Sequence, residues 1–87
     1  MSSGPRRCDD CAFNRVAGET VVVKALDGTV TVLNSPGGEI WEMCDGRTSI
    51  DRIVERLCGD YDAPPGTIRR EVEAFIDSMV EKGMMTR

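Results

Sequence analysis

Two short runs of β-branched residues on either side of an Asp-Gly pair constrain this chain most strongly. Residues 20–26 contain three consecutive valines, and Thr29–Leu33 alternates between threonine and valine before it ends in leucine. β-Branched residues favour strands, and an alternation with a period of two indicates a strand with one buried face. Asp27-Gly28 between the runs is a strong signal for a two-residue hairpin turn. The sequence therefore predicts an antiparallel hairpin, which a shorter strand over residues 12–17 extends to three strands.

After residue 34 the apolar spacing changes to the 3.6-residue period of amphipathic helices. A short first helix is expected before Asp45-Gly46, a second from about residue 49 to Gly59, and a third from about residue 65 to Gly83. The apolar stripes of the second and third helices are Ile50, Ile53, Val54, Leu57 and Cys58, and Ile68, Val72, Phe75, Ile76, Met79 and Val80. A small sheet is marginal in water by itself, so we expect the helices to pack against it. The predicted class is α+β, with three strands followed by three helices.

The chain is short and contains no histidine among its 87 residues. A folded chain of this size hides about 60–65% of the surface that its unfolded form exposes, which leaves little room for a buried active site. The lack of histidine removes the commonest general base and the commonest metal ligand. No glycine-rich phosphate loop with its partner lysine follows a strand. We therefore expect an adaptor rather than an enzyme, and no cofactor.

The charge balance and the apolar runs limit the possible partners. The formal net charge is −4 and the isoelectric point is near 4.7, whereas nucleic-acid binding depends on lysine and arginine that neutralise phosphates. No apolar run approaches the roughly 20 residues needed to cross a bilayer, and residues 1–7 lack the apolar stretch of a signal peptide. We expect a cytoplasmic protein with neither a nucleic-acid nor a membrane partner.

The four cysteines raise the alternative of a metal or redox module. Cys8 and Cys11 have the spacing of one half of a zinc knuckle, but the other half is missing. Cys44 and Cys58 continue apolar helix stripes, so they are interpreted as small buried hydrophobes. No metal site is predicted, and a small module based on the first cysteine pair stays open as an alternative.

The polar residues 1–11 are expected to form a flexible tail ahead of a single domain over residues 12–87. Within that domain, Thr29–Leu33 carries no proline and no charged residue, the usual devices that protect the edge of a sheet. An unprotected edge strand can accept a further strand from a peptide through its main-chain groups. From the residues alone, an edge strand and a core strand are equally compatible with this pattern.

A set of ordered landmarks over residues 19–86 resembles the PqqD-like family. The landmarks are Val32-Leu33-Asn34, Glu39-Ile40-Trp41-Glu42, Cys44-Asp45-Gly46-Arg47-Thr48-Ser49-Ile50-Asp51, Ile53-Val54 with Leu57, Tyr61-Asp62, Glu71-Val72 with Phe75-Ile76, and Lys82-Gly83-Met84-Met85. The resemblance implies a winged-helix-like fold with a three-stranded antiparallel sheet and three helices. It also implies a recognition element that holds the leader of a ribosomally synthesised precursor peptide. Such an element presents the leader to a maturase, often a radical S-adenosylmethionine enzyme, without doing chemistry itself.

The resemblance also implies where the leader would bind. It would add as a strand along Thr29–Leu33 and lie between that strand and the third helix. The implied peptide-binding residues are Thr29, Val30, Thr31, Val32 and Leu33 on the strand, and Ile68, Arg69, Arg70, Val72, Glu73 and Ile76 on the helix. The pathway could be that of pyrroloquinoline quinone or of another modified peptide. A winged-helix nucleic-acid binder that uses Arg69 and Arg70 is a further alternative.

Overall fold

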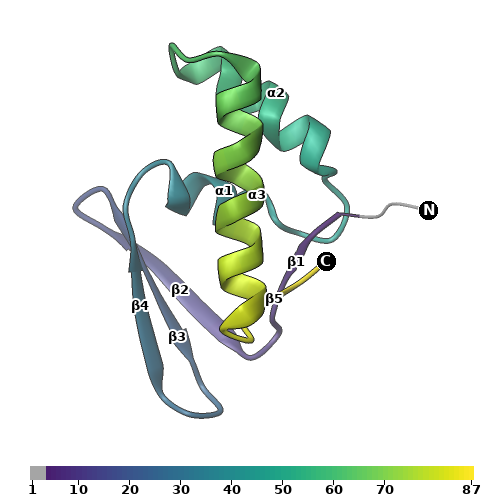
Figure 1. The fold of residues 1–87 in the computed structure, drawn as a ribbon. Coiled ribbons are helices and arrows are strands. Elements are labelled where there is room, and N and C mark those ends of the chain that lie inside the picture. The colour runs from purple at the N-terminus through teal and green to yellow at the C-terminus, as the bar shows by residue number, and fades with distance from the viewer. Residues whose placement is uncertain (1–3) are drawn as a thin grey trace.

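The computed structural model describes residues 4–87, which form one three-stranded sheet, a two-stranded pair and three helices (Figure 1). The elements are β1 (Arg6–Arg7), β2 (Cys11–Val16), β3 (Glu19–Lys24), β4 (Thr29–Leu33), α1 (Gly37–Met43), α2 (Ile50–Asp60), α3 (Pro65–Glu81) and β5 (Met85–Thr86). The sheet has the antiparallel order β2-β3-β4, and β1 pairs with β5 apart from it. The α+β class and the order of three sheet strands before three helices are confirmed.

The hairpin between β3 and β4 has a longer loop than the Asp-Gly pair suggests. Lys24 pairs with Thr29, so residues 25–28 form the loop, and the Gly28 N–H donates to the Lys24 carbonyl at 2.8 Å. Gly28 has φ of +72°, a conformation that glycine adopts without steric cost. The Asp27 carboxylate accepts the Thr29 N–H at 3.0 Å. The prediction of a two-residue turn is wrong, although the hairpin and the glycine position are right.

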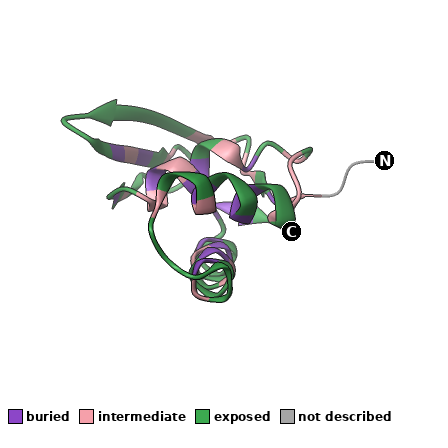
Figure 2. Ribbon diagram, turned by 90° about the horizontal axis from the view of Figure 1, so that it is seen from above, coloured by how far each residue is buried: buried purple, intermediate pink, exposed green. Residues whose placement is uncertain are grey.

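The helices cover one face of the sheet only. Val22 on β3 and Leu33 on β4 are buried against them, whereas Val30 and Val32 are exposed on the opposite face. In Figure 2 the buried segments gather where the helices meet each other and the sheet, and the hairpin end is exposed. The largest fully buried side chains are Trp41, Ile53, Ile76, Met79 and Met84. One apolar core therefore joins all three helices to the inner face of the sheet.

The end of α3 returns the chain towards the sheet. Gly83 has φ of +75°, its N–H donates to the Val80 carbonyl at 3.0 Å, and the Met84 N–H donates to the Met79 carbonyl at 2.9 Å. These two bonds around a left-handed glycine form a Schellman motif, which satisfies carbonyls at the end of a helix. The motif directs Met84 and Met85 into the core, where both are buried.

Residues 4–11 are not the loose tail that the sequence suggests. Arg7 on β1 pairs with Met85 on β5, and its backbone N–H donates to the Cys44 carbonyl at 2.9 Å. The Arg7 guanidinium donates to the carbonyls of Trp41 and Glu42, at 3.0 and 2.7 Å, at the end of α1. The prediction failed because these partners are distant in sequence and leave no local pattern. The expected tail also includes residues 1–3, which lie outside the described residues.

Two glycines in helices offer a matched test of packing. A Cβ on Gly38 of α1 would lie 2.3 Å from Oγ1 of Thr20, a side chain that is almost fully buried, whereas a Cβ on Gly59 of α2 would meet nothing within 4 Å. We expect Gly38→Ala to lower the free energy of unfolding by about 1–3 kcal/mol through overpacking. Gly59→Ala should raise it by about 0.5–1 kcal/mol through helix propensity. Urea denaturation followed by Trp41 fluorescence measures both, and a Gly38→Ala protein as stable as the parent would contradict the packing.

The N-terminal anchor is tested at two neighbouring arginines. Arg7→Ala removes two charge-assisted hydrogen bonds and the cation–π contact of Arg7 with Phe13, where the guanidinium carbon lies 5.3 Å from the ring centre. We expect a loss of about 1–2 kcal/mol in the free energy of unfolding. Arg6→Ala removes an exposed ion pair with Asp9 and part of the packing of the Arg6 side chain on Gly46, and it should cost less than about 0.5 kcal/mol. Equal losses in the two variants would show that Arg7 is no anchor.

Candidate peptide-binding edge

Strand β4 lies at one edge of the sheet, with β3 on its inner side. Within residues 4–87 no strand pairs with its outer side. Its sequence contains neither proline nor a charged residue, so its outward N–H and C=O groups are free of the usual edge protection. The opposite edge strand, β2, carries the charged Arg15. Of the two readings of Thr29–Leu33, the edge strand is the one found.

The side chains of β4 divide between two surfaces. Val30 and Val32 are 59% and 54% exposed on the outer face of the sheet. Thr31 points inward, where its hydroxyl donates to Sδ of Met84 at 3.6 Å, and Leu33 is buried. A strand added beside β4 would alternate in the same way, with every second side chain beside the valines and the others towards α3.

One flank of α3 faces β4, and Phe75 marks it. The Phe75 ring and the Leu33 side chain both lie within 4 Å of the position that a Cβ on Gly37 would take. Residues spaced three or four apart share a helix face, so the same flank carries the other residues of this series. The series is Glu71, Phe75, Ser78 and Lys82, of which Phe75 is half-buried and the others are exposed. The apolar stripe predicted from the sequence includes Phe75, but no sequence pattern marks this flank.

The predicted charged residues of α3 lie on other sides of the helix. Arg69 forms ion pairs with Asp51 at the start of α2 and with Glu73, and Glu73 also pairs with Arg87 at 3.6 Å. These contacts turn Arg69 and Glu73 towards α2 and the C-terminal segment, nearly opposite the flank of Phe75. Arg70 is exposed on the side away from the core. The structure therefore does not bring these three residues together with β4.

The predicted apolar residues of α3 are part of the core. Ile68 is 6% exposed, and Val72 and Ile76 are fully buried. Ile68 and Val72 also line a cavity of about 180 Å³ together with Pro36 and Glu71. In this structure the three side chains hold the helix against the core, and the Phe75 flank borders them. The sequence shows the stripe, but the rotation of α3 about its axis depends on packing.

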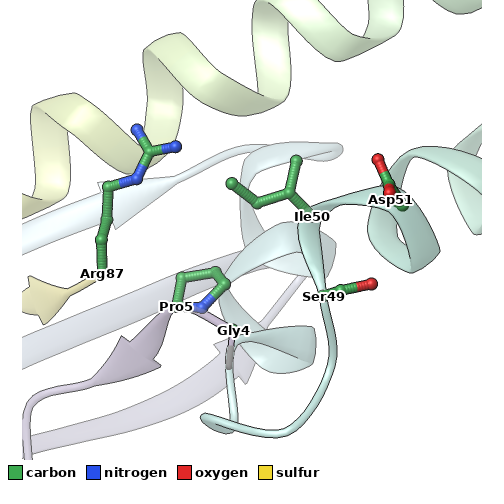
Figure 3. Close-up of a pocket in the computed structure, with 6 residues that line it drawn as sticks. All are labelled: Gly4, Pro5, Ser49, Ile50, Asp51 and Arg87. Carbon is green, nitrogen blue, oxygen red and sulfur yellow. The ribbon is translucent and has the colours of Figure 1, made fainter. Parts of the chain in front are cut away.

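A second cavity lies away from β4, between the N-terminal segment and the start of α2 (Figure 3). It has a volume of about 270 Å³, and Pro5, Ile50 and Arg87 are among its lining residues. Asp51, which also lines it, is paired with Arg69, and Arg87 is paired with Asp77 and Glu73. The charged groups of this cavity are thus engaged within the protein.

The environment of Cys8, Cys11 and Cys44 bears on the alternative of a metal or redox module. Cys8 and Cys11 lie in a turn in which the Cys11 N–H donates to the Cys8 carbonyl at 3.2 Å. Burial, followed by the neighbouring Cys8, raises the pKa of Cys11 from 9.0 to about 11, and burial raises that of Cys44 to about 12. A raised pKa disfavours the thiolate that binds metals and attacks disulfides. Residues 4–87 contain no cluster of three or more metal-ligating side chains.

Cys58 is only half-buried, so its interpretation as a core residue is too strong, whereas Cys44 is fully buried. No helix within residues 4–87 has the length and apolar character needed to span a bilayer.

The fold and the exposed edge define a small α+β domain that can accept a peptide strand. Residues 19–85 match the family described as "Coenzyme PQQ synthesis protein D (PqqD)". The chain therefore belongs to the PqqD family, which confirms the resemblance.

Two curated relatives are described as "PqqA binding protein", from Rhodopseudomonas palustris strains BisB5 and ATCC BAA-98 / CGA009. Each is 33% identical over 48 residues, which cover 55% of this chain and 47% of the relative. The match thus spans about half the length of these relatives.

Two solved structures share the fold. One, described as "TbiB1 in Complex with the TbiA(beta) Leader Peptide", has a TM-score of 0.85 and 21% identity, over 92% of this chain and 93% of that one. The other, described as "Lasso peptide synthetase B1 complexed with the leader peptide", has a TM-score of 0.88 and 18% identity, over 98% and 100% of the two chains.

The raised pKa of Cys11 predicts slow alkylation. At pH 8 the thiolate fraction is about a hundredth of that at an ordinary pKa of 9.0, and the greater nucleophilicity of the more basic thiolate recovers part of the rate, which leaves it about tenfold slower. Iodoacetamide labelling followed by mass spectrometry of the Cys11 peptide measures this rate. Denaturation in urea should remove the difference, and equal rates in the folded and unfolded protein would contradict the raised pKa.

Proposed function

We propose that this chain is a non-catalytic adaptor that binds the leader region of a ribosomally synthesised precursor peptide by adding it as a strand to β4. The observation that carries the proposal is the position of β4 at the sheet edge, without proline or charge, beside the Phe75 flank of α3. The names of the relatives and the leader peptides in the two similar complexes support it.

Strand addition suits a carrier of variable peptides. Each main-chain hydrogen bond contributes about 0.5–1.5 kcal/mol net and asks little of the peptide side chains. Alternate side chains then supply selectivity, through Val30 and Val32 on the outer face and Phe75 on the inner one. The chain has no histidine, so we assign to it binding and presentation rather than chemistry.

We further propose that the adaptor presents the bound leader to a peptide-modifying enzyme in the cytoplasm. A radical S-adenosylmethionine maturase is the first candidate, because the family resemblance implies it. A lasso peptide system is the second, because one of the similar solved structures is described as a lasso peptide synthetase B1. The correct maturase should modify its precursor faster when this chain is added, and the wrong one should be unaffected.

A proline in the edge strand tests the binding mode. Val32→Pro removes one N–H from β4, and it should abolish binding of a synthetic leader peptide from the precursor encoded beside this gene. Isothermal titration calorimetry measures the affinity, which we expect between roughly nanomolar and micromolar for the parent protein. Val32→Thr, which keeps both the N–H and the β-branched side chain at this position, is the matched control and should leave binding intact.

The position of the contact is tested separately from the proline variant, in case that variant does not fold. In NMR spectra of the parent protein, the leader should shift the amide signals of Thr29–Leu33 and of the Phe75 flank. Shifts confined to other parts of the molecule would overturn the proposed site, as would undiminished leader binding by a folded Val32→Pro protein.

A further inference from the structure

The Thr29 end of the β4 edge is bordered by two lysines. Nζ of Lys24, the residue that pairs with Thr29, lies 2.7 Å from the position that a Cβ on Gly83 would take. Lys82 precedes Gly83 and is exposed at the end of the flank that carries Phe75. The end of α3 therefore brings a second lysine to the same end of β4.

Two carboxylates near the Thr29 end accept hydrogen bonds from backbone N–H groups of the hairpin. Asp27 accepts the Thr29 N–H at 3.0 Å, and Asp10 accepts the Leu26 N–H at 3.0 Å. The lysines form no ion pair with either residue. Both carboxylates keep their negative charges, and Asp27 attracts Lys24, so the exposed Lys82 supplies most of the positive charge that a peptide meets at the Thr29 end.

The Leu33 end of the edge has the opposite charge. Glu71 is exposed on the Phe75 flank and lines the small cavity beside Pro36, just after the end of β4. Glu39, in the first turn of α1, accepts hydrogen bonds from Ser35 and Tyr61. Arg15 lines a cavity with Glu39, but its guanidinium is bound to Glu42. Negative charge therefore predominates at this end.

The direction of a bound strand relates these charges to the peptide. The sheet is antiparallel throughout, and antiparallel pairing is slightly more stable per residue than parallel pairing. A peptide antiparallel to β4 has its N-terminal end beside Leu33 and its C-terminal end beside Thr29. Its middle faces Phe75 and the two valines of β4.

We propose that the β4 edge selects leader segments that carry basic residues before an apolar β-strand core and acidic residues after it, bound antiparallel to β4. This inference rests on the proposed function, because it concerns the same edge. Glu71 meets the basic end, and Lys24 and Lys82 meet the acidic end. The sequence suggested Arg69 and Arg70 as peptide-binding residues, but both lie on other sides of α3. Lys24 and Lys82 take the role of the positive contacts instead.

Two synthetic peptides of identical composition test the charge order. Both are blocked at their ends and share a core of alternating threonine and valine; one begins with two lysines and ends with two glutamates, and the other has these charges exchanged. We expect the peptide with the N-terminal lysines to bind about three- to tenfold more tightly at low salt, as suits a few exposed ion pairs. Fluorescence anisotropy measures both affinities, and the preference should weaken as salt screens the pairs.

A charge-reversed protein supplies the decisive comparison. Glu71→Lys combined with Lys82→Glu exchanges the charges at both ends of the flank without a change in net charge. Because Lys24 and Glu39 keep their charges, the variant should lose the preference. Arg70→Glu combined with Glu81→Lys is the matched control on exposed positions away from this flank. It should keep the preference of the parent protein.

The outcomes separate this inference from the proposed function. The inference would be overturned by equal affinities for the two peptides, by a preference for the exchanged order, or by a loss or reversal of the preference in the control variant. It would also be overturned if the protein bound the leader but bound neither synthetic peptide. Strand addition would survive these results as long as the leader still shifts the amide signals of Thr29–Leu33. Loss of leader binding at β4 would overturn the proposed function itself.

Discussion

The antiparallel pairing of β3 with β4 satisfies the main-chain hydrogen-bonding groups on only one side of β4. Both the core and the candidate binding edge depend on this asymmetry. Val22 and Leu33 bury the inner face of the sheet against the helices. A fourth strand would complete the main-chain hydrogen bonds, but residues 4–87 do not provide one on that side. The stable core and the unpaired edge therefore come from the same hairpin, and the chain combines a rigid support with a site for an added strand.

The contacts around β1 and β5 hold α3 in its place beside that edge. Arg7 binds the end of α1 and the Cys44 carbonyl, while β1 pairs with the strand that follows α3. The Schellman motif at Gly83 turns the chain into this pair, next to Lys24. β1 and β5 lie at the two ends of the described chain, so the position of the end of α3 beside Lys24 depends on both strands.

Much of the fold could be predicted from the sequence because its signals are local. The alternation in Thr29–Leu33 and the stripe through Ile68, Val72 and Ile76 each lie within one element, and both elements form as predicted. The length of the loop over residues 25–28 was not predicted, because the hydrogen bonds of the hairpin override the local Asp27-Gly28 signal. The positions of Arg69 and Glu73 relative to β4 could not be predicted, since ion pairs with Asp51 and Arg87 orient both side chains away from that strand.

The sequence by itself determined the strands, the helices and the lack of protection on β4, because strand propensity, helical periodicity and the absence of proline are properties of short segments. Only the tertiary structure decided that β4 is an edge, that Phe75 and not Arg69 faces it, and that Lys24 lies beside the Gly83 end of α3. These facts depend on contacts between distant segments. The rotation of a helix is chosen by how its whole stripe packs, and no window of sequence contains that information.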